Sequence, residues 1–284
     1  MTPVLVRQHL PQAGPVPRAD LGARARDWSE IQERMLVPLY EAVYERLDVG
    51  FRTRLLALGC GSGLALLMAA RRGAALTGVE PSSPQRLALA HERLATGASR
   101  AHTRGGVRLT DSLAEDTAGS QTPSYNLVTA FEPIGCLADD AEGLAGVLTA
   151  ATPLAEPGTP VVLAGWGPPE RCATSAVLRA VAGRAEPPGH QALRPALRDD
   201  LEEVARRADL GPDGSGRVAC PFGYAGVESA VRGLLSTGLC DAAIVATGQE
   251  QIEKELTEAL HPYRRPDGTV WMPNVFRYLI ARTP

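Results

Sequence analysis

Lysine is almost absent from this 284-residue chain, in which Lys254 is the single lysine among 29 basic residues. The arginines that supply the remaining positive charge are interspersed with acids, as in the segment 202–207, and the formal net charge is −3. A protein that binds nucleic acid needs a concentrated stripe of positive charge to neutralise phosphates. The composition therefore argues against nucleic acid as a partner.

Closely spaced cysteines and long apolar runs are also missing. No Cys-x-x-Cys pair and no histidine at metal-ligand spacing accompanies the five cysteines, so we expect reduced thiols and no metal site. They are Cys60, Cys136, Cys172, Cys220 and Cys240. Glycine or arginine interrupts every apolar run before the roughly 20 residues of a membrane span, and the N-terminus shows no charged-then-apolar signal pattern. The expectation is a soluble, cytoplasmic protein with no membrane partner.

The composition that remains is that of a globular protein, with 44% hydrophobic and 21% charged residues. The length suits one large α/β domain, alone or with an attached cap. Residues 1–26 contain four prolines, which predicts a flexible arm, so the domain is expected to cover 27–284. Apolar residues at three- and four-residue spacing predict a helix over 27–47, capped by Asp27 or Ser29.

Strand and helix patterns then alternate along the first part of the domain. Helices are expected from about 64 to 72, 84 to 94 and 141 to 151. Strands are expected over 54–58, 75–79, 107–110, 125–131 and 160–166. This alternation is typical of parallel βαβ units and predicts a doubly wound, mostly parallel sheet.

The second half of the chain is less regular. Its apolar patterns predict helices around 170–182, 195–208, 227–236 and 241–260. Strands are expected over 217–222 and 275–281, the second of them after the turn signal Pro266-Asp-Gly268.

A glycine-rich turn, Gly59-Cys-Gly-Ser-Gly63, lies between the first strand and its helix. Glycines let the chain turn sharply and bring backbone amides against a ligand at a helix N-terminus. Glu80 ends the next strand, where a carboxylate can accept both hydroxyls of a ribose. In such a crevice the carboxylate would be exposed to the ligand and contribute little to packing. The combination predicts a nucleoside site.

The glycine spacing narrows the choice of nucleoside. A dinucleotide fingerprint needs Gly-x-Gly-x-x-Gly, but position 64 is Leu64, and no Gly-Lys-Ser/Thr follows to make a Walker loop. The form present resembles motif I of class I S-adenosylmethionine-dependent methyltransferases. The resemblance continues at Val79-Glu80-Pro81, Asp111-Ser112 and Phe131-Glu132, and the segments 164–171, 220–222, 263–268 and 274–278 look like those of actinobacterial small-molecule methyltransferases.

This resemblance implies a seven-stranded Rossmann-like methyltransferase fold whose last strand is antiparallel and inserted beside the sixth. It also implies an N-terminal helix and C-terminal helical cap elements at about 167–215 and 225–268. The implied cofactor is S-adenosyl-L-methionine. The residues expected to bind it are Gly59, Cys60, Gly61, Gly63, Glu80, Pro81, Asp111, Ser112, Phe131 and Trp28.

Two positions depart from the family pattern, since many relatives carry acids where this chain has Ala57 and Asn126. Methyl transfer needs alignment and exclusion of water, with a base only when the acceptor must lose a proton. His190 is the candidate base, whereas His91 is expected on a solvated helix face and His102 in a loop.

Several of these side chains could instead have a purely structural role. Asp111 could be a helix cap, Phe131 a core residue and Trp28 a helix-packing residue, and Trp166 and Tyr224 could either line a substrate pocket or fill the core.

The sequence thus predicts an S-adenosylmethionine-dependent methyltransferase that acts on a small molecule, such as a secondary metabolite. Two alternatives stay open: a methyltransferase-fold cyclase or rearrangement catalyst that transfers no methyl group, and an NAD-dependent oxidoreductase. The acceptor and a homo-oligomeric state are left open as well.

Overall fold

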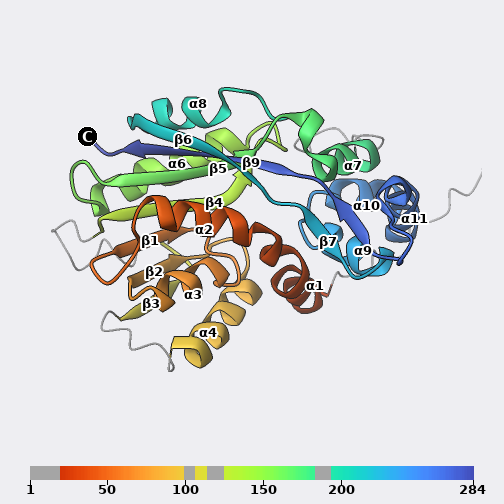
Figure 1. Cartoon of the computed structure of the whole chain (residues 1–284), viewed down its shortest axis with the longest axis horizontal. Helices are drawn as coiled ribbons and strands as arrows, with labels where there is room; N and C mark the ends of the chain where they lie inside the picture. The colour runs from red at the N-terminus through yellow and green to blue at the C-terminus, as the bar shows by residue number, and fades with distance from the viewer. Residues whose placement is uncertain (1–19, 99–105, 114–124, 183–192) are drawn as a thin grey trace, which may run out of the picture.

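The structure, a computed structural model, describes residues 20–98, 106–113, 125–182 and 193–284. Its centre is a seven-stranded sheet in the order β3-β2-β1-β4-β5-β9-β6, in which β9 runs antiparallel to both neighbours (Figure 1). The strands are β1 (Arg54–Leu58), β2 (Ala75–Val79), β3 (Val107–Thr110), β4 (Leu127–Ile134), β5 (Pro160–Trp166), β6 (Gly211–Ala219) and β9 (Val275–Arg282). The predicted doubly wound sheet, with its last strand inserted beside the sixth, is confirmed.

Helices cover both faces of this sheet because its central strands are apolar on both sides. On β1, Leu55 and Ala57 join the core formed with α2 (Val37–Arg46) and α3 (Leu64–Arg71). The intervening Leu56 and Leu58 face α6 (Asp140–Ala151) and α8 (Asp200–Arg207). Such continuous apolar runs are typical of parallel strands buried between two helical layers. Helix α4 (Pro84–Ala98) packs beside α3.

The strand order reverses between β1 and β4, since β2 and β3 lie on one side of β1 and β5 lies beyond β4. In open α/β sheets, ligands bind at such a switch point, outside the carboxyl ends of the strands. The ends of β1 and β4 therefore mark where to look for a site.

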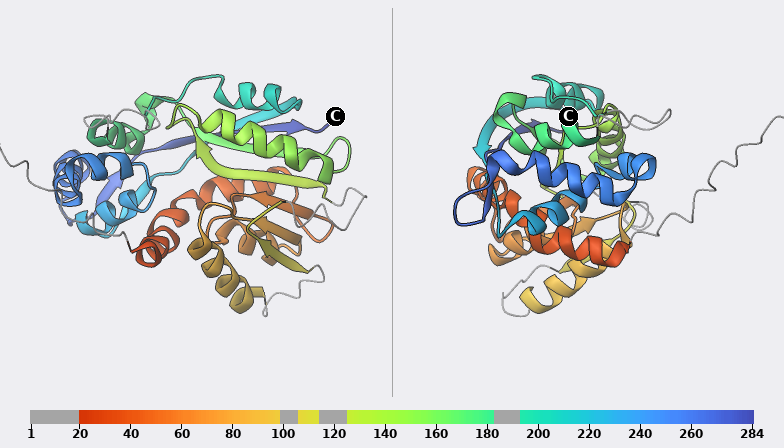
Figure 2. Two further views of the ribbon diagram at one scale, coloured as in Figure 1. Left: turned by 180° about the vertical axis from the view of Figure 1, so that it is seen from behind. Right: turned by 90° about the vertical axis from the view of Figure 1, so that its right-hand side faces the viewer.

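A helical cap lies beyond these carboxyl ends (Figures 1 and 2). It contains α7 (Ala173–Ala182), α9 (Val227–Leu235), α10 (Asp241–Thr247) and α11 (Gln249–Ala259), with a hairpin of β7 (Phe222–Tyr224) and β8 (Val270–Met272). Single turns also adjoin the sheet and cap elements: η3 (Thr152–Leu154) after α6, η4 (Pro169–Arg171) before α7 and η5 (His261–Tyr263) after α11. None of the helices in the described ranges combines the length and apolar character needed to cross a bilayer.

The N-terminal helix begins earlier than predicted. α1 (Leu21–Asp27) starts within the expected arm 1–26, because the Asp20 carboxylate accepts a hydrogen bond from the Ala23 amide and caps it. The chain then passes through a π-helical turn, η1 (Trp28–Gln32), and a 3₁₀ turn, η2 (Glu33–Leu36), before α2. The predicted start at residue 27 and the regular helix over 27–47 are therefore wrong, while residues 1–19 lie outside the described ranges.

The predicted cap segments also need correction. Helix α8 and the start of β6 fall within 167–215, but α8 buries Leu201, Val204 and Ala205 against the sheet. The strand expected over 217–222 is two strands, β6 and β7, in different sheets. The helix expected over 241–260 is two helices, because Gly248 interrupts it at φ +93°.

Candidate functional site

The glycine-rich turn connects β1 to α3 at the switch point. Gly59, Gly61 and Gly63 all have positive φ, of 63°, 57° and 81°, and Gly63 is the N-cap of α3. Side chains with a Cβ rarely adopt this backbone conformation. The turn therefore brings its backbone to the carboxyl end of the sheet in the way the sequence predicts.

Glu80 holds this turn through hydrogen bonds to backbone amides. Its carboxylate accepts hydrogen bonds from the Gly61 amide at 2.8 Å and from the Ser82 amide at 3.0 Å, and the residue is 1% exposed. The expectation of an exposed side chain with little part in packing is therefore wrong. Glu80 joins the end of β2 to the glycine turn, and its contact with a ribose stays a prediction.

The π-helical turn places two side chains over Gly61. In this turn the Glu33 amide bonds to the Trp28 carbonyl, which aligns residues five apart. A Cβ on Gly61 would lie 3.0 Å from Glu33 Oε1 and 3.4 Å from Trp28 Nε1. The N-terminal segment thus packs against the glycine turn and leaves no room for a side chain at position 61.

Glu33 is a buried carboxylate, 2% exposed, and is the centre of a polar network that spacing in the sequence does not reveal. It accepts bonds from the Ser62 hydroxyl and the Leu64 amide, and pairs with Arg93 of α4 at 2.5 Å. Arg93 also donates to the Ser62 carbonyl and to the Ser29 hydroxyl. The network ties the N-terminal segment, the glycine turn and α4 together.

One cavity of about 560 Å³ opens from the glycine turn toward the cap. Of the residues predicted to bind the cofactor, five line it: Trp28, Gly59, Pro81, Asp111 and Ser112. Cys60, Gly61 and Phe131 line a narrow recess of about 20 Å³ that shares Trp28, Gly59 and Glu132 with the cavity. Gly63 and Glu80 line neither; Gly63 packs against Ala90 of α4, where a Cβ would meet Ala90 Cβ at 3.0 Å.

Two residues of the recess have a structural role as well. Phe131 packs between Tyr40 and Tyr44 at ring-centroid distances of 4.9 and 5.7 Å, so its core interpretation holds alongside its position on the recess. Burial, with Glu80 and Glu33 nearby, raises the pKa of the Cys60 thiol to about 12. The thiol is therefore neutral at physiological pH and is not a nucleophile.

Glu132 lies at the boundary between recess and cavity. The pairing of β4 with β5 shifts register between Ala130 and Ile134, and such irregularities re-aim side chains near functional sites. The Glu132 side chain is 58% exposed, but that surface faces the cavity. Enclosure by protein raises the carboxyl pKa, Arg86 at 4.0 Å opposes this effect, and the Glu80 carboxylate adds to it.

Trp28 and Arg86 provide further polar groups where the recess meets the cavity: Trp28 lines both, and Arg86 lines the recess. The indole Nε1 of Trp28 is buried and has no hydrogen-bond partner among the described residues, and the Arg86 guanidinium lies 4.1 Å above its ring. A buried donor without a partner is costly unless a ligand supplies an acceptor. Together with Glu132, these groups suit a ligand end that carries both an anionic and a cationic group.

The opposite end of the cavity is an apolar chamber, defined here by Leu36, Ile134, Leu137, Trp166, Phe222, Leu239 and Phe276. The rings of Trp166 and Phe276 lie 4.6 Å apart, and Phe222 stacks 5.9 Å from Phe276. Trp166 therefore lines the pocket, whereas Tyr224 is buried behind it.

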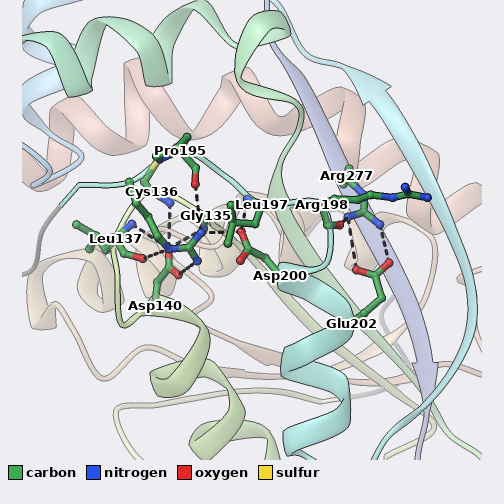
Figure 3. A network of polar contacts seen from close by, with 11 residues as sticks. Gly135, Cys136, Leu137, Asp140, Pro195, Leu197, Arg198, Asp200, Glu202 and Arg277 are labelled. Atoms are coloured by element: carbon green, nitrogen blue, oxygen red, sulfur yellow. Dashed lines mark hydrogen bonds and ion pairs between the residues drawn. The ribbon is translucent and has the colours of Figure 1, made fainter.

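Asp140 and Arg194 hold one wall of the chamber. Figure 3 shows Asp140 beside Gly135, Cys136 and Leu137. The Asp140 carboxylate accepts from the amides of Gly135, Cys136 and Leu137 at 2.6 to 3.1 Å. Arg194 donates to the Leu137 carbonyl and pairs with both Asp140 and Asp200. The loop after β4 is thereby anchored to the N-termini of α6 and α8, while Arg277 and Glu202 pair beside it.

The remaining candidates lie away from the cavity or outside the described residues. Asn126 accepts from the Arg54 amide and donates to the Arg52 carbonyl at the amino ends of the strands, far from the glycine turn, so its departure from the family pattern has no bearing on the site. His91 is exposed, as expected. The candidate base His190, like His102, lies outside the described residues.

A scan against protein-family models gave no match, and a search of curated protein sequences gave none either. Solved structures do resemble the chain. A candidate methyltransferase of Bacillus halodurans C-125 has a TM-score of 0.53 at 14% identity, covering 86% of this chain and 98% of that one. An S-adenosylmethionine-dependent methyltransferase of Methanosarcina mazei has 0.52 at 11%, covering 84% and 96%, and the [4+2]-cyclase SpnF has 0.50 at 17%, covering 87% and 80%. The chain has the Rossmann-like fold that these proteins share.

Proposed function

We propose that the chain is an S-adenosylmethionine-dependent methyltransferase that acts on a small, largely apolar molecule. The observation that carries this proposal is the continuous cavity that joins the glycine turn to the apolar chamber. A cofactor bound at the turn and an acceptor in the chamber would meet within this cavity. Such placement converts a bimolecular reaction into one between aligned groups.

The residues at the glycine turn fit this cofactor. Trp28 Nε1 and the Arg86 guanidinium would bind the carboxylate of its methionine end, and Glu132 would bind the ammonium. Pro81, Asp111 and Ser112 lie along the cavity where its nucleoside would extend. The cofactor supplies a methyl group on a positively charged sulfur. The protein's own part is to align the acceptor and exclude water.

Calorimetry with S-adenosylhomocysteine is the first test. We expect binding at micromolar strength, about −7 to −8 kcal/mol, and no binding of NAD. No heat and no thermal shift at millimolar S-adenosylhomocysteine would contradict the proposal, and NAD binding in its place would favour the oxidoreductase.

A second candidate function comes from the cyclase SpnF, which shares the fold. The fold therefore does not decide whether a methyl group is transferred. Incubation with S-adenosylmethionine and acceptor extracts separates the two: a methyltransferase forms one S-adenosylhomocysteine per product molecule. Conversion of a substrate without S-adenosylhomocysteine would favour the cyclase.

A further inference from the structure

One amide group interrupts the lining of the apolar chamber. Gln32 lies in the π-helical turn, is 5% exposed and lines the cavity one helical turn before Leu36. Chamber residues nearby, such as Trp166 and Phe276, are hydrophobic. A buried amide in such surroundings is expected to have hydrogen-bond partners for both of its ends.

Among the residues that the structure describes, only the carbonyl end of this amide has a hydrogen-bond partner. The Tyr224 hydroxyl donates to Gln32 Oε1 at 3.1 Å, and the same oxygen lies against Gly233 of α9. Burial raises the pKa of the Tyr224 phenol well above its ordinary value, so the phenol stays protonated and remains a donor. The Nε2 amino group makes no hydrogen bond to any residue in the described ranges. Tyr224 thus fixes the amide with its N–H donors available to the cavity.

Other polar side chains near the chamber are already engaged. The Thr237 hydroxyl donates to the Leu234 carbonyl at 2.6 Å and accepts from the Leu239 amide. The Asp140 carboxylate is occupied by three backbone amides and Arg194. Gln32 Nε2 differs from them as a donor that has no acceptor within the described part of the chain.

We propose that Gln32 orients the acceptor molecule by donating a hydrogen bond from Nε2 to its oxygen. The substrate class is a neutral, largely apolar compound that carries a carbonyl oxygen. This inference rests on the proposed function in assigning the chamber to the acceptor. A site built to hydrogen-bond one group discriminates against an analogue that lacks it, because the buried donor is then left unpaired.

Two probes with the same ring frame test this inference: 1-tetralone, which carries a carbonyl oxygen, and tetralin, which lacks it. Their dissociation constants are measured on the full chain, with and without saturating S-adenosylhomocysteine. Gln32→Met and Gln32→Leu each remove the donor, so the test does not depend on the folding of one variant. We expect either variant to reduce the preference for tetralone over tetralin by about three- to tenfold.

Two further variants separate orientation from general packing. Tyr224→Phe removes the hydroxyl that fixes the amide, and should reduce the preference by a smaller factor. Thr237→Val changes another side chain that lines the cavity, whose hydroxyl is already engaged, and should leave the preference unchanged. The dissociation constant of S-adenosylhomocysteine should be unaltered in the Gln32 variants.

A preference that persists in both Gln32 variants, or no binding of tetralone to the unaltered protein at millimolar concentration, would overturn the inference. Failure of S-adenosylhomocysteine to bind the unaltered protein would overturn the proposed function alone. The tetralone preference of the cofactor-free protein would still report on Gln32.

Discussion

The two ends of the cavity differ in how they are held. At the glycine turn, buried carboxylates and backbone amides meet in directional hydrogen bonds, as between Glu80 and Gly61 or Glu33 and Leu64. At the chamber, aromatic and aliphatic side chains pack together around one amide. Hydrogen bonds depend on single atoms, whereas hydrophobic packing tolerates changes that keep volume. The turn should therefore be sensitive to small changes that the chamber would accommodate.

Gly61→Val should have the largest effect and abolish cofactor binding. The valine would need a φ near +57° and would contact Glu33 Oε1 and Trp28 Nε1. Because these contacts close the turn, thermal stability should fall too. Gly158→Val is the matched control, since its φ is +72° but no atom lies within 4 Å of a Cβ there. Normal S-adenosylhomocysteine binding by a folded Gly61 variant would show that the turn is not the site.

Glu33→Gln should lower the free energy of unfolding by about 3 kcal/mol, since breaking a buried ion pair leaves its partner uncompensated. This is the lower end of the usual range, because the Arg93 side chain is 21% exposed. Urea denaturation measures the loss. Glu203→Gln, which breaks exposed pairs with Arg206 and Arg207, is the control and should cost much less. Equal losses would mean that the network around Glu33 does not stabilise the fold.

Glu80→Ala should weaken S-adenosylhomocysteine binding by about ten- to a hundredfold and lower stability by about 2 kcal/mol. The stability loss follows from the amides of Gly61 and Ser82, which would both lose their acceptor. Calorimetry and urea denaturation measure the two effects. An unchanged dissociation constant with reduced stability would mean that Glu80 stabilises the glycine turn and does not contact the ligand.

Glu132→Gln should have the smallest effect. We expect three- to tenfold weaker binding of S-adenosylhomocysteine, a loss of about 1 kcal/mol in binding free energy. Only the ionised carboxylate attracts the ligand's ammonium, and its pKa is raised in surroundings that include Arg86, Glu80 and Tyr40. Affinity should therefore fall as the pH is lowered, and the fall should begin at a higher pH than for an ordinary carboxyl group.

The Gln variant of Glu132 should lose this pH dependence. Asp139→Asn changes an exposed acid in the loop that follows β4, away from the cavity lining, and should keep the dependence. Calorimetric titration of the unaltered protein and of both variants at several pH values measures this dependence. Identical pH profiles would mean that Glu132 does not contact the cofactor.

The fold could be predicted where local pattern and burial agree. The bounds of β1, β2, β3 and β5 match the expected ranges, because each is a short strand pattern that ends at a turn or an acid. The periodicity of α8 shows that it has a buried face but not which surface covers that face, so its assignment to the cap was wrong. The start of α1 was missed because the prolines of residues 1–26 predicted a flexible arm. Its N-cap depends on a hydrogen bond to the Asp20 side chain, which the proline content does not indicate.

The glycine turn could be predicted because its backbone requirement is local to five residues. The polar groups around it could not, because Glu33 and Arg93 are 60 residues apart and no spacing connects them. Glu132 was noted only as part of a resemblance, and its position follows from an irregularity in β4. Gln32 was missed because an amide within an apolar helical pattern gives no sign of which cavity it will face.

The π-helical turn contains one residue more than a turn of α-helix, and this residue determines how the side chains of the N-terminal segment are oriented around the helix axis. Each residue advances an α-helix by about 100°, so removing one residue between Trp28 and Glu33 would swing one of them away from Gly61 by that angle. The same rotation would displace Gln32 from Tyr224. The contacts at both ends of the cavity therefore depend on the same helical phase, and a deletion in this turn would displace the proposed cofactor and acceptor contacts together.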